Sequence, residues 1–471
     1  MKAHIKDYFD KVADKRLNRR KRHSYYWNDI TKYCNYFITN ESSVCEIGCG
    51  NGEMLAALNG KRKVGLDLSP KMVENARKHH AGISFIEMDA ENIQLEEKFD
   101  VIIVSNLVGF LEDIQKCFTE LNKLCHRDTK IIVTYYNYLW EPLLKLFEKT
   151  GLKLKTPSQN WLTNADIKNM LYLAGFDVYR SSKRQIIPVN IPLLSWLFNT
   201  ILARLPFFNI FCINNYLFAK KQAGTYSEAE KEFSVSVVVP ARNEAGNIEN
   251  AILRLPQMGT FTELIFIEGN STDDTWQTIQ AVYAKYKDSM RIKIGRQEGK
   301  GKNDAVKKGF SMAEGDVLMI LDADLTVPPE DLTKFYNAIS SGKGDFINGS
   351  RLVYDMEDGA MRFLNVIGNK FFSLAFTWLL SQPFKDTLCG TKVIFRKDYD
   401  QLESNRKFFG NFDPFGDFDL IFGAYKLNLK IIEIPIRYKE RTYGSTNISR
   451  FKHGIILLRM CFFAARKIKF Y

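Results

Sequence analysis

Short apolar runs recur along the chain, and each ends in a polar or glycine-rich loop before a stretch with helical spacing. In the first half these runs begin at Ser43, Lys63, Ile83 and Phe99. In the second half they begin at Ser234, Glu263 and Val317. Runs of this length are typical of buried parallel strands, and their alternation with helical stretches predicts βαβ units. We therefore expect an α/β protein with two Rossmann-like domains.

A polar stretch without apolar periodicity separates the two halves and has the composition of a linker. We place one domain at residues 1–220, the linker at 221–232, a second domain at 233–450 and a basic amphipathic segment at 451–471. Residues 193–205 are strongly apolar and suit a lid, a dimer face or a membrane-surface helix. Packing within the first domain is the simplest interpretation of that stretch.

Composition adds an expectation about partners. The chain has 471 residues, 45% of them hydrophobic, and a net charge of +12 that favours anionic partners such as nucleotides, phosphorylated substrates or an acidic membrane face. Aromatic residues are not interleaved with a long basic stripe, so we do not expect a nucleic-acid partner. The eight cysteines contain no CxxC pair and indicate the reduced thiols of a cytosolic chain.

Membrane insertion is not expected from the sequence. The first residues lack the apolar core of a signal peptide, and no apolar run is long enough to cross a bilayer. The nearest run is interrupted at Pro192, Asn199, Arg204 and Pro206. We expect a cytoplasmic protein that is either soluble or bound peripherally to the inner face of a membrane.

A glycine turn follows the first strand of the first half. Glycines stand at positions 48, 50 and 52, where the backbone must approach a ligand or adopt a positive φ, and Glu46 lies just ahead. A dinucleotide-binding turn would carry a further glycine where this chain has Glu53. The added acid disfavours a dinucleotide and suits a ligand with an ammonium group and a sulfonium centre.

Later strands of the first half end in acids that suit a nucleoside. Asp67 ends the second strand, where an acid can accept both ribose hydroxyls. Together these motifs show that residues 43–140 resemble a class I S-adenosylmethionine-dependent methyltransferase. The resemblance assigns cofactor binding to Glu46, Gly48, Gly50, Gly52, Asp67, Asp89, Ala90 and Ser105. It implies in-line methyl transfer by positioning and desolvation, and no general base stands out.

The methyl acceptor is not identified by the sequence. Aromatic and amide residues follow the fifth strand at Tyr135, Tyr136, Asn137 and Trp140. They either line the acceptor pocket or belong to the core and rim of the domain.

Two carboxylates end the third apolar run of the second half, at Asp322 and Asp324, before the break at Pro328 and Pro329. Ligands of open α/β sheets bind at the carboxyl ends of strands. Two acids at such an end can share a divalent cation whose shell is completed by diphosphate oxygens. The alternative is a pair of loop acids that cap the next helix.

Further motifs accompany this pair in order, at residues 240–244, 349–351, 386–390 and 441–445. With them, residues 233–450 resemble a family 2 glycosyltransferase of the GT-A fold, in particular the polyprenyl-phosphate mannose or glucose synthases. The resemblance assigns nucleotide-sugar contacts to Pro240, Arg242, Glu244, Glu268, Lys300, Asp322, Ala323 and Asp324. It assigns Mg or Mn to Asp322 and Asp324, and catalytic roles to these two acids, Arg351, Arg362, Arg441 and Asp417.

Three departures from that family pattern qualify the resemblance. The usual D-D-G-S motif is replaced by residues Glu268 to Ser271, which leaves the nucleobase open. Thr326 stands where the synthases often carry Gln, so the metal shell can differ. We expect no counterpart of the two-helix membrane anchor that some relatives carry.

The implied reaction is inverting transfer with stabilisation of the departing diphosphate by the metal and cationic side chains. A lipid-phosphate acceptor needs no base, whereas a hydroxyl acceptor needs one, and Asp417 is the candidate. In the alternative interpretation, the acceptor is a hydroxyl of a saccharide or secondary metabolite, and the first half is a cofactor-binding or scaffold module. The acids around Asp417 can also simply hold loops together.

Two apolar stretches bear on delivery of a lipid acceptor. Residues 371–380 are apolar and aromatic, and residues 451–471 mix apolar side chains with arginine and lysine. Both suit contact with an anionic membrane surface. The alternative is ordinary core packing followed by a basic solvated tail.

Overall fold

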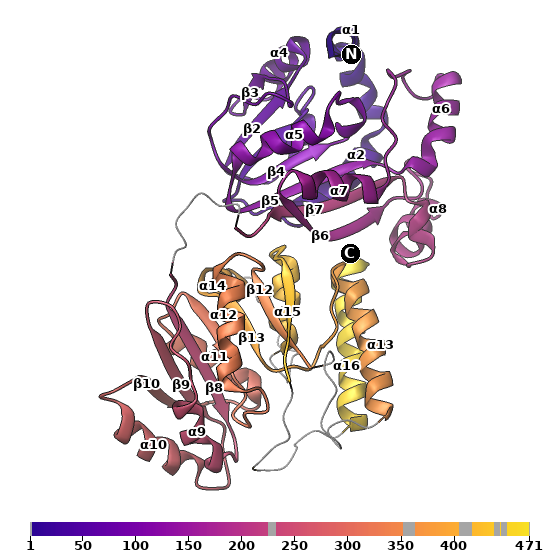
Figure 1. The fold of residues 1–471 in the computed structure, drawn as a ribbon. Helices are drawn as coiled ribbons and strands as arrows, with labels where there is room; N and C mark the ends of the chain where they lie inside the picture. Colours follow the sequence, from indigo (N-terminus) through magenta and orange to yellow (C-terminus); the bar gives the residue numbers. More distant parts are fainter. Residues whose placement is uncertain are drawn as a thin grey trace. The chain divides into compact units, whose positions relative to one another are not determined.

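The computed structural model describes residues 2–224, 232–351, 363–404, 417–437, 443 and 450–470. The chain forms two compact units, residues 1–226 and 227–469. Figure 1 shows each unit as a twisted sheet flanked by helices. The predicted fold class, α/β with two Rossmann-like sheets, is confirmed.

The first unit contains a seven-stranded sheet with strand order β3-β2-β1-β4-β5-β7-β6. Its strands are β1 (Ser43–Ile47), β2 (Arg62–Asp67), β3 (Ser84–Glu87), β4 (Phe99–Ser105), β5 (Cys125–Tyr136), β6 (Phe176–Arg184) and β7 (Asn214–Lys221). Strands β1 to β5 are parallel, and β7 is antiparallel to both β5 and β6. Because β1 pairs with β2 on one side and β4 on the other, the loop after β1 lies at the topological switch point.

Helices of the first unit are α1 (Lys2–Arg22), α2 (Ser24–Asn35), α3 (Glu53–Ala57), α4 (Pro70–His79), α5 (Ile114–Leu121), α6 (Glu141–Lys149), α7 (Asn164–Leu173) and the short α8 (Leu194–Trp196). Local sequence explains where several of them begin. Ser69 caps α4 by accepting from the Met72 amide, with Pro70 at the first helical position. Thr163 opens α7 with a capping box closed by Asp166.

The stretch around α8 differs from the simplest expectation of internal packing. It continues from α8 into a π-helical turn, Leu197–Ile201, and several of its large apolar side chains face solvent. Leu193 is 82% exposed and Trp196 is 58% exposed. No helix in the described part of the chain has the length and hydropathy needed to cross a bilayer.

The second unit has a seven-stranded sheet with strand order β10-β9-β8-β11-β13-β12-β14. Its strands are β8 (Val235–Ala241), β9 (Thr262–Glu268), β10 (Arg291–Arg296), β11 (Val317–Ile320), β12 (Phe346–Ser350), β13 (Lys392–Phe395) and β14 (Ile431–Pro435). Among the strands that the structure describes in this unit, only β13 is antiparallel to its neighbours, β11 and β12. The carboxyl ends of β8, β9 and β11 therefore meet at one edge.

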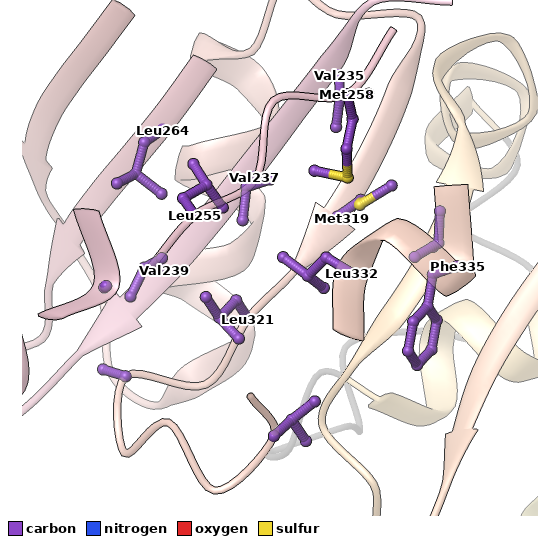
Figure 2. Close-up of a cluster of buried hydrophobic side chains, with 14 of the residues drawn as sticks. Val235, Val237, Val239, Leu255, Met258, Leu264, Met319, Leu321, Leu332 and Phe335 are labelled. Carbon is purple, nitrogen blue, oxygen red and sulfur yellow. The ribbon is translucent and has the colours of Figure 1, made fainter. Parts of the chain in front are cut away.

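Helices of the second unit are α9 (Ile248–Leu253), α10 (Thr275–Tyr286), α11 (Lys302–Met312), α12 (Leu332–Ser340), α13 (Phe363–Leu380), α14 (Arg396–Ser404), α15 (Asp417–Lys426) and α16 (Arg450–Ala464). Figure 2 shows part of the core, where Val235, Val237 and Val239 of β8 point to one face of the sheet at the period of two. Leu332 and Phe335 of α12 pack against the same cluster. This core fixes β8 and β11, which carry the loops of the candidate site.

Candidate active sites

The glycine loop of the first unit has a backbone that only glycine adopts easily. Gly48, Gly50 and Gly52 have φ angles of 75°, 54° and 81°. A Cβ on Gly52 would also lie 2.6 Å from the Phe85 ring. The loop is therefore held close to its neighbours, with its backbone open to approach by a ligand.

Asp67 at the end of β2 is hydrogen-bonded to this loop. Its Oδ2 accepts from the Gly50 amide at 2.7 Å, and its Oδ1 accepts from the Ser69 amide at 2.9 Å. Burial raises the pKa of Asp67 above its ordinary value, although these two backbone donors oppose the rise. Each carboxylate oxygen retains a second lone pair, so the group can still accept hydroxyls.

The other predicted cofactor residues come from the ends of adjacent parallel strands. Glu46 is buried in β1, Asp89 and Ala90 follow β3, and Ser105 is buried at the end of β4. The Ser105 hydroxyl lies 3.3 Å from that of Thr134 on β5. The structure thus brings the predicted set together along one edge of the sheet.

Helix α1 also contacts this edge, which sequence reasoning did not predict. The Lys2 ammonium lies 2.8 Å from carboxylates of both Asp89 and Glu91. Asp10 accepts from the Ser69 hydroxyl at 2.5 Å and from the Lys71 amide at 3.2 Å. Charges spaced four apart at positions 2, 6 and 10 were a signal that one face of this helix has charged partners.

A pocket lies at the carboxyl ends of β4 and β5. Its polar and aromatic lining consists of Asn106, Tyr135, Tyr136, Gln159, Asn160 and Trp161. Two of the aromatic residues considered for an acceptor pocket are therefore in its wall. The other two candidates are used in packing: the Asn137 amide donates to the Ile210 and Cys212 carbonyls, and Trp140 Nε1 donates to the Phe211 carbonyl.

The two acids of the second unit follow β11. Asp322 Oδ1 lies 2.5 Å from the Lys302 ammonium, which comes from the first turn of α11. Burial alone would raise the pKa of Asp322, but Lys302, with help from Lys392 and Arg351, holds it below its ordinary value. Asp322 is therefore ionised and already faces a cation.

Asp324 is nine-tenths buried and is oriented by Thr326. Its Oδ1 accepts from the Thr326 amide at 3.1 Å and from the Thr326 hydroxyl at 2.8 Å. The residue that departs from the family pattern thus positions the second acid. Ala323 between them is buried.

Gly390, in the loop that precedes β13, lies directly against Asp322. A Cβ at this position would lie 1.9 Å from Asp322 Oδ2 and 2.4 Å from Lys302 Nζ. The motif at residues 386–390 therefore ends in glycine because its backbone must pass beside the acid and the lysine.

Arg351 has a specific carboxylate partner. Its Nε and a terminal guanidinium nitrogen each donate at 2.8 Å to the buried Asp386, and its backbone amide donates at 2.9 Å. Burial alone would raise the pKa of Asp386, but Arg351 holds it below its ordinary value. The Asp386 amide in turn donates to Glu433 on β14 at 2.9 Å. Arg351 thus fixes the loop that carries Gly390.

The predicted nucleotide residues lie in loops that are hydrogen-bonded to one another. Pro240 is in β8, and the loop after it joins the loop after β9 where Asn243 Oδ1 accepts from the Thr272 amide at 2.8 Å. Glu268 accepts from the Ser271 amide at 2.5 Å and from Arg296 Nε at 3.1 Å. These bonds hold Glu268 at the end of β9.

Charged residues from these loops stand at the same edge. Glu244 is buried and accepts from the Asn247 amide group at 2.7 Å. Arg242 and Lys300 are exposed. The loop that carries Lys300 is joined to the loop after β9 by the Asn270 side chain, which donates to the Gly299 carbonyl at 3.3 Å.

Some predicted residues lie outside the described part of the chain: Arg362, Arg441 and the side chain of Asp417. Asp419, from the same acidic stretch, lies 3.5 Å from the Asn303 amide nitrogen. Among the residues that the structure describes, no group of three or more His, Cys, Asp and Glu side chains could hold a metal ion by itself.

Comparison with known families assigns each half. Residues 45–133 match the family model of a methyltransferase domain, and residues 236–402 match that of glycosyl transferase family 2. The predicted recognition of both kinds of transferase is confirmed.

Individual relatives cover parts of the chain. Dolichol-phosphate mannosyltransferase of Pyrococcus furiosus is 38% identical over 25% of this chain and 33% of its own length. Glycosyltransferase AglJ of Haloferax volcanii is 28% identical over 48% of this chain and 69% of its own length. A SAM-dependent methyltransferase structure from Thermotoga maritima is 17% identical and covers 46% of this chain and 100% of that chain, with a TM-score of 0.38. The chain thus spans about a third of the length of the first relative.

Proposed function

Because residues 45–133 are a methyltransferase domain and residues 236–402 a family 2 glycosyl transferase domain, we propose that the chain is a bifunctional transferase. Its first unit transfers a methyl group from S-adenosylmethionine. Its second unit transfers a hexose from a nucleotide sugar to a lipid phosphate, with inversion and with a divalent metal ion.

The proposal of glycosyl transfer rests mainly on the arrangement around Asp322. An ionised carboxylate at the end of β11 already holds a cation, the Lys302 ammonium, at 2.5 Å, and Asp324 follows two residues later. Carboxylate oxygens are the ligands that Mg²⁺ and Mn²⁺ prefer, so the donor set fits such an ion. Asp322 and Asp324 would hold it, and the ion would supply positive charge to a departing diphosphate.

Cations supplied by the chain itself complete the donor site. Arg242 and Lys300 come from loops at the same edge, and Lys302 comes from the first turn of α11; all three suit the phosphates of a nucleotide sugar. Arg351 acts indirectly in this proposal, because it fixes the Asp386 loop and so the backbone that confines Asp322.

The name of the Pyrococcus furiosus relative supports a lipid phosphate as the acceptor. A phosphate acceptor is already an anion and needs no general base for its attack. A surface for lipid is available where α13 and α16 lie side by side (Figure 1). Their exposed side chains include Phe371, Leu374, Ile455, Leu458 and Phe462.

The charge on this helix pair favours an anionic membrane face as its partner. Arg459 and Arg466 are exposed on α16 and its continuation, on the same stripe as Ile455 and Phe462. Apolar burial combined with attraction to anionic lipid headgroups is the usual basis of peripheral binding.

For methyl transfer, the first unit supplies positioning. The glycine loop and Asp67 suit the cofactor's amino-acid and ribose ends. S-adenosylmethionine would supply an electrophilic methyl group at this edge of the sheet. The chain's own residues hold and orient the reactants and exclude water.

The test is transfer by the full chain from a panel of nucleotide sugars to a short-chain polyprenyl phosphate with Mn²⁺, followed by mass spectrometry. We expect a hexosyl lipid phosphate that disappears in Asp324→Asn. Glu314→Gln removes an exposed acid of the same unit and should leave transfer unchanged. Transfer by Asp324→Asn at the wild-type rate would refute the metal assignment, and transfer only to hydroxyl compounds would refute the acceptor.

A further inference from the structure

Three neighbouring strands of the second unit end together at the edge that carries the proposed donor site. Strand β9 lies between β8 and β10, and its Glu268 is in register with Ala241 on one side and Arg296 on the other (Figure 1). The Gly269 backbone amide donates to the Ala241 carbonyl at 2.8 Å, and the Gln297 backbone amide donates to the Glu268 carbonyl at 3.0 Å. These bonds fix the backbone one residue beyond the strands, where Gly269 and Gln297 are neighbours.

Glu268, which the family resemblance assigns to the nucleotide, is used within the fold. It is 2% exposed, and its carboxylate accepts from the Ser271 backbone amide at 2.5 Å and from Arg296 Nε at 3.1 Å. The next residue, Gly269, has no side chain that could replace it. Recognition of a nucleobase at the end of β9 therefore needs a side chain from a neighbouring segment.

Gln297, directly after β10, has such a side chain. It is nine-tenths buried, yet its side-chain amide has no hydrogen-bond partner among the residues that the structure describes. A Cβ on Gly269 would lie 3.7 Å from Gln297 Oε1, so the amide lies beside this glycine. A buried polar group without a partner is costly, so its presence favours a ligand that supplies one.

The place of Gln297 in the sheet fits the length of a nucleotide. Strands β10, β9, β8 and β11 are adjacent in that order, and neighbouring strands are about 4.8 Å apart. The end of β11 is therefore roughly 10 Å from the end of β9 and roughly 14 Å from the end of β10. An extended nucleoside diphosphate covers such a distance, with its base at Gln297 and its phosphates beside Asp322 and Asp324.

The side-chain amide of Gln297 has the chemistry to pair with the edge of a base. It carries both a donor and an acceptor, so it can form two hydrogen bonds to an acceptor and a donor that are adjacent on the base. Resting on the proposed glycosyl transfer, we infer that Gln297 recognises the nucleobase of the nucleotide sugar. It takes over this role from Glu268, whose carboxylate is bonded within the fold.

A carboxylate in place of this amide would change which base binds best. An ionised carboxylate only accepts hydrogen bonds. Guanine presents two donors side by side on one edge, at N1 and N2, whereas uracil, adenine and cytosine each present one donor group beside an acceptor. Gln297→Glu should therefore shift the preference towards guanine, whichever base the wild type prefers.

Titration calorimetry on the full chain with Mg²⁺ tests this inference. The probes are the diphosphates of guanosine, uridine, adenosine and cytidine, and inorganic pyrophosphate, which has the phosphates without a base. We expect Gln297→Leu to weaken the tightest nucleoside diphosphate at least about tenfold and to leave pyrophosphate binding unchanged. Gln297→Glu should raise the affinity for guanosine diphosphate relative to uridine diphosphate at least about tenfold. The matched controls, Gln280→Leu and Gln280→Glu, change an exposed glutamine of α10 and should keep the wild-type affinities.

The outcomes separate the inference from the function beneath it. Failure of the wild-type chain to bind any nucleoside diphosphate would refute the proposed glycosyl transfer itself. If the wild type binds one, unchanged nucleoside diphosphate binding by Gln297→Leu would overturn the inference alone, because the base would then lie elsewhere. An equal loss of pyrophosphate binding would also overturn it, since the effect would not depend on the base. So would a Gln297→Glu variant that keeps the wild-type ratio of the guanosine and uridine diphosphate affinities.

Discussion

Gly390→Ala probes how tightly the backbone confines Asp322. The new Cβ would lie 1.9 Å from Asp322 Oδ2, whereas ordinary contact begins near 3.4 Å, so the carboxylate must move by roughly 1.5 Å. A misplacement of about 1 Å at a reacting centre can cost on the order of 100-fold in rate. We therefore expect hexosyl transfer to fall about 100-fold or more.

Stability should change little in the same variant. The atoms that clash are the ends of two flexible side chains, Asp322 and Lys302, which can turn aside without moving the backbone. We expect the free energy of unfolding to change by less than about 1 kcal/mol. Transfer from the nucleotide sugar, followed by mass spectrometry, and urea unfolding measure the two effects separately.

The control is Gly368→Ala in α13, where a new Cβ would meet nothing within 4 Å. It should leave both transfer and stability close to those of the wild type. Full transfer by Gly390→Ala would refute the reasoning, because Asp322 would then tolerate displacement. A large loss of stability would also contradict the reasoning, because the new Cβ would then disturb the folded backbone and not only the side chains of the site.

Three further substitutions test other parts of the structure. Gly52→Ala meets the Phe85 ring at 2.6 Å and should abolish S-adenosylmethionine binding in calorimetry. Arg351→Met leaves the buried Asp386 carboxylate without its partner and should cost about 3 kcal/mol of unfolding free energy at pH 7.5. Phe462→Asp removes a side chain that is 76% exposed on α16 and should weaken sedimentation with anionic vesicles about tenfold.

Each has a matched control. Gly82 has a φ of 83°, close to that of Gly52, but open space around it. Gly82→Ala therefore introduces only the strain of an alanine at positive φ, and it should leave cofactor binding intact. Arg254 makes the same two-bond pair with Glu330 at the surface, and Arg254→Met should cost less than about 1 kcal/mol. Leu253→Asp, at a site 63% exposed on α9, should not affect vesicle binding. Equal effects in variant and control would contradict the corresponding prediction.

The Arg351 effect should also depend on pH. Arg351 lowers the pKa of Asp386 below 3.8 in the folded state, so the pair stabilises the protein above that pH. The stabilisation is lost as the pH falls through the lowered folded-state value. The stability difference between wild type and Arg351→Met should therefore be largest near neutral pH and should shrink below about pH 4. Urea unfolding across this range would contradict the assignment if the difference grew towards acid.

The strands of both sheets could be predicted from the sequence because the pattern that marks a strand is local. The run that begins at Val317 is uniformly apolar and ends in acids, and it forms β11 with all four residues buried. The glycine turn after β1 was equally direct, because its positions need positive φ angles.

Contacts between side chains that are distant in the sequence could not be predicted from local patterns. Arg351 and Asp386 lie in separate motifs, and only the fold brings them within hydrogen-bonding distance. Lys300 and Lys302 flank a glycine, and which of them meets Asp322 depends on α11 beginning at Lys302. The exposure of Leu193 and Trp196 likewise depends on tertiary packing and not on the apolar pattern itself.

Diffraction from crystals of the full chain grown with Mn²⁺ and a nucleoside diphosphate, recorded at the manganese absorption edge, shows whether Asp322 and Asp324 hold a metal ion. We expect an anomalous peak within coordination distance of Asp322 and Asp324 and next to the diphosphate, in addition to the Lys302 ammonium that already lies beside Asp322. A nucleotide bound at another edge of the sheet, or bound here without an ion, would contradict it.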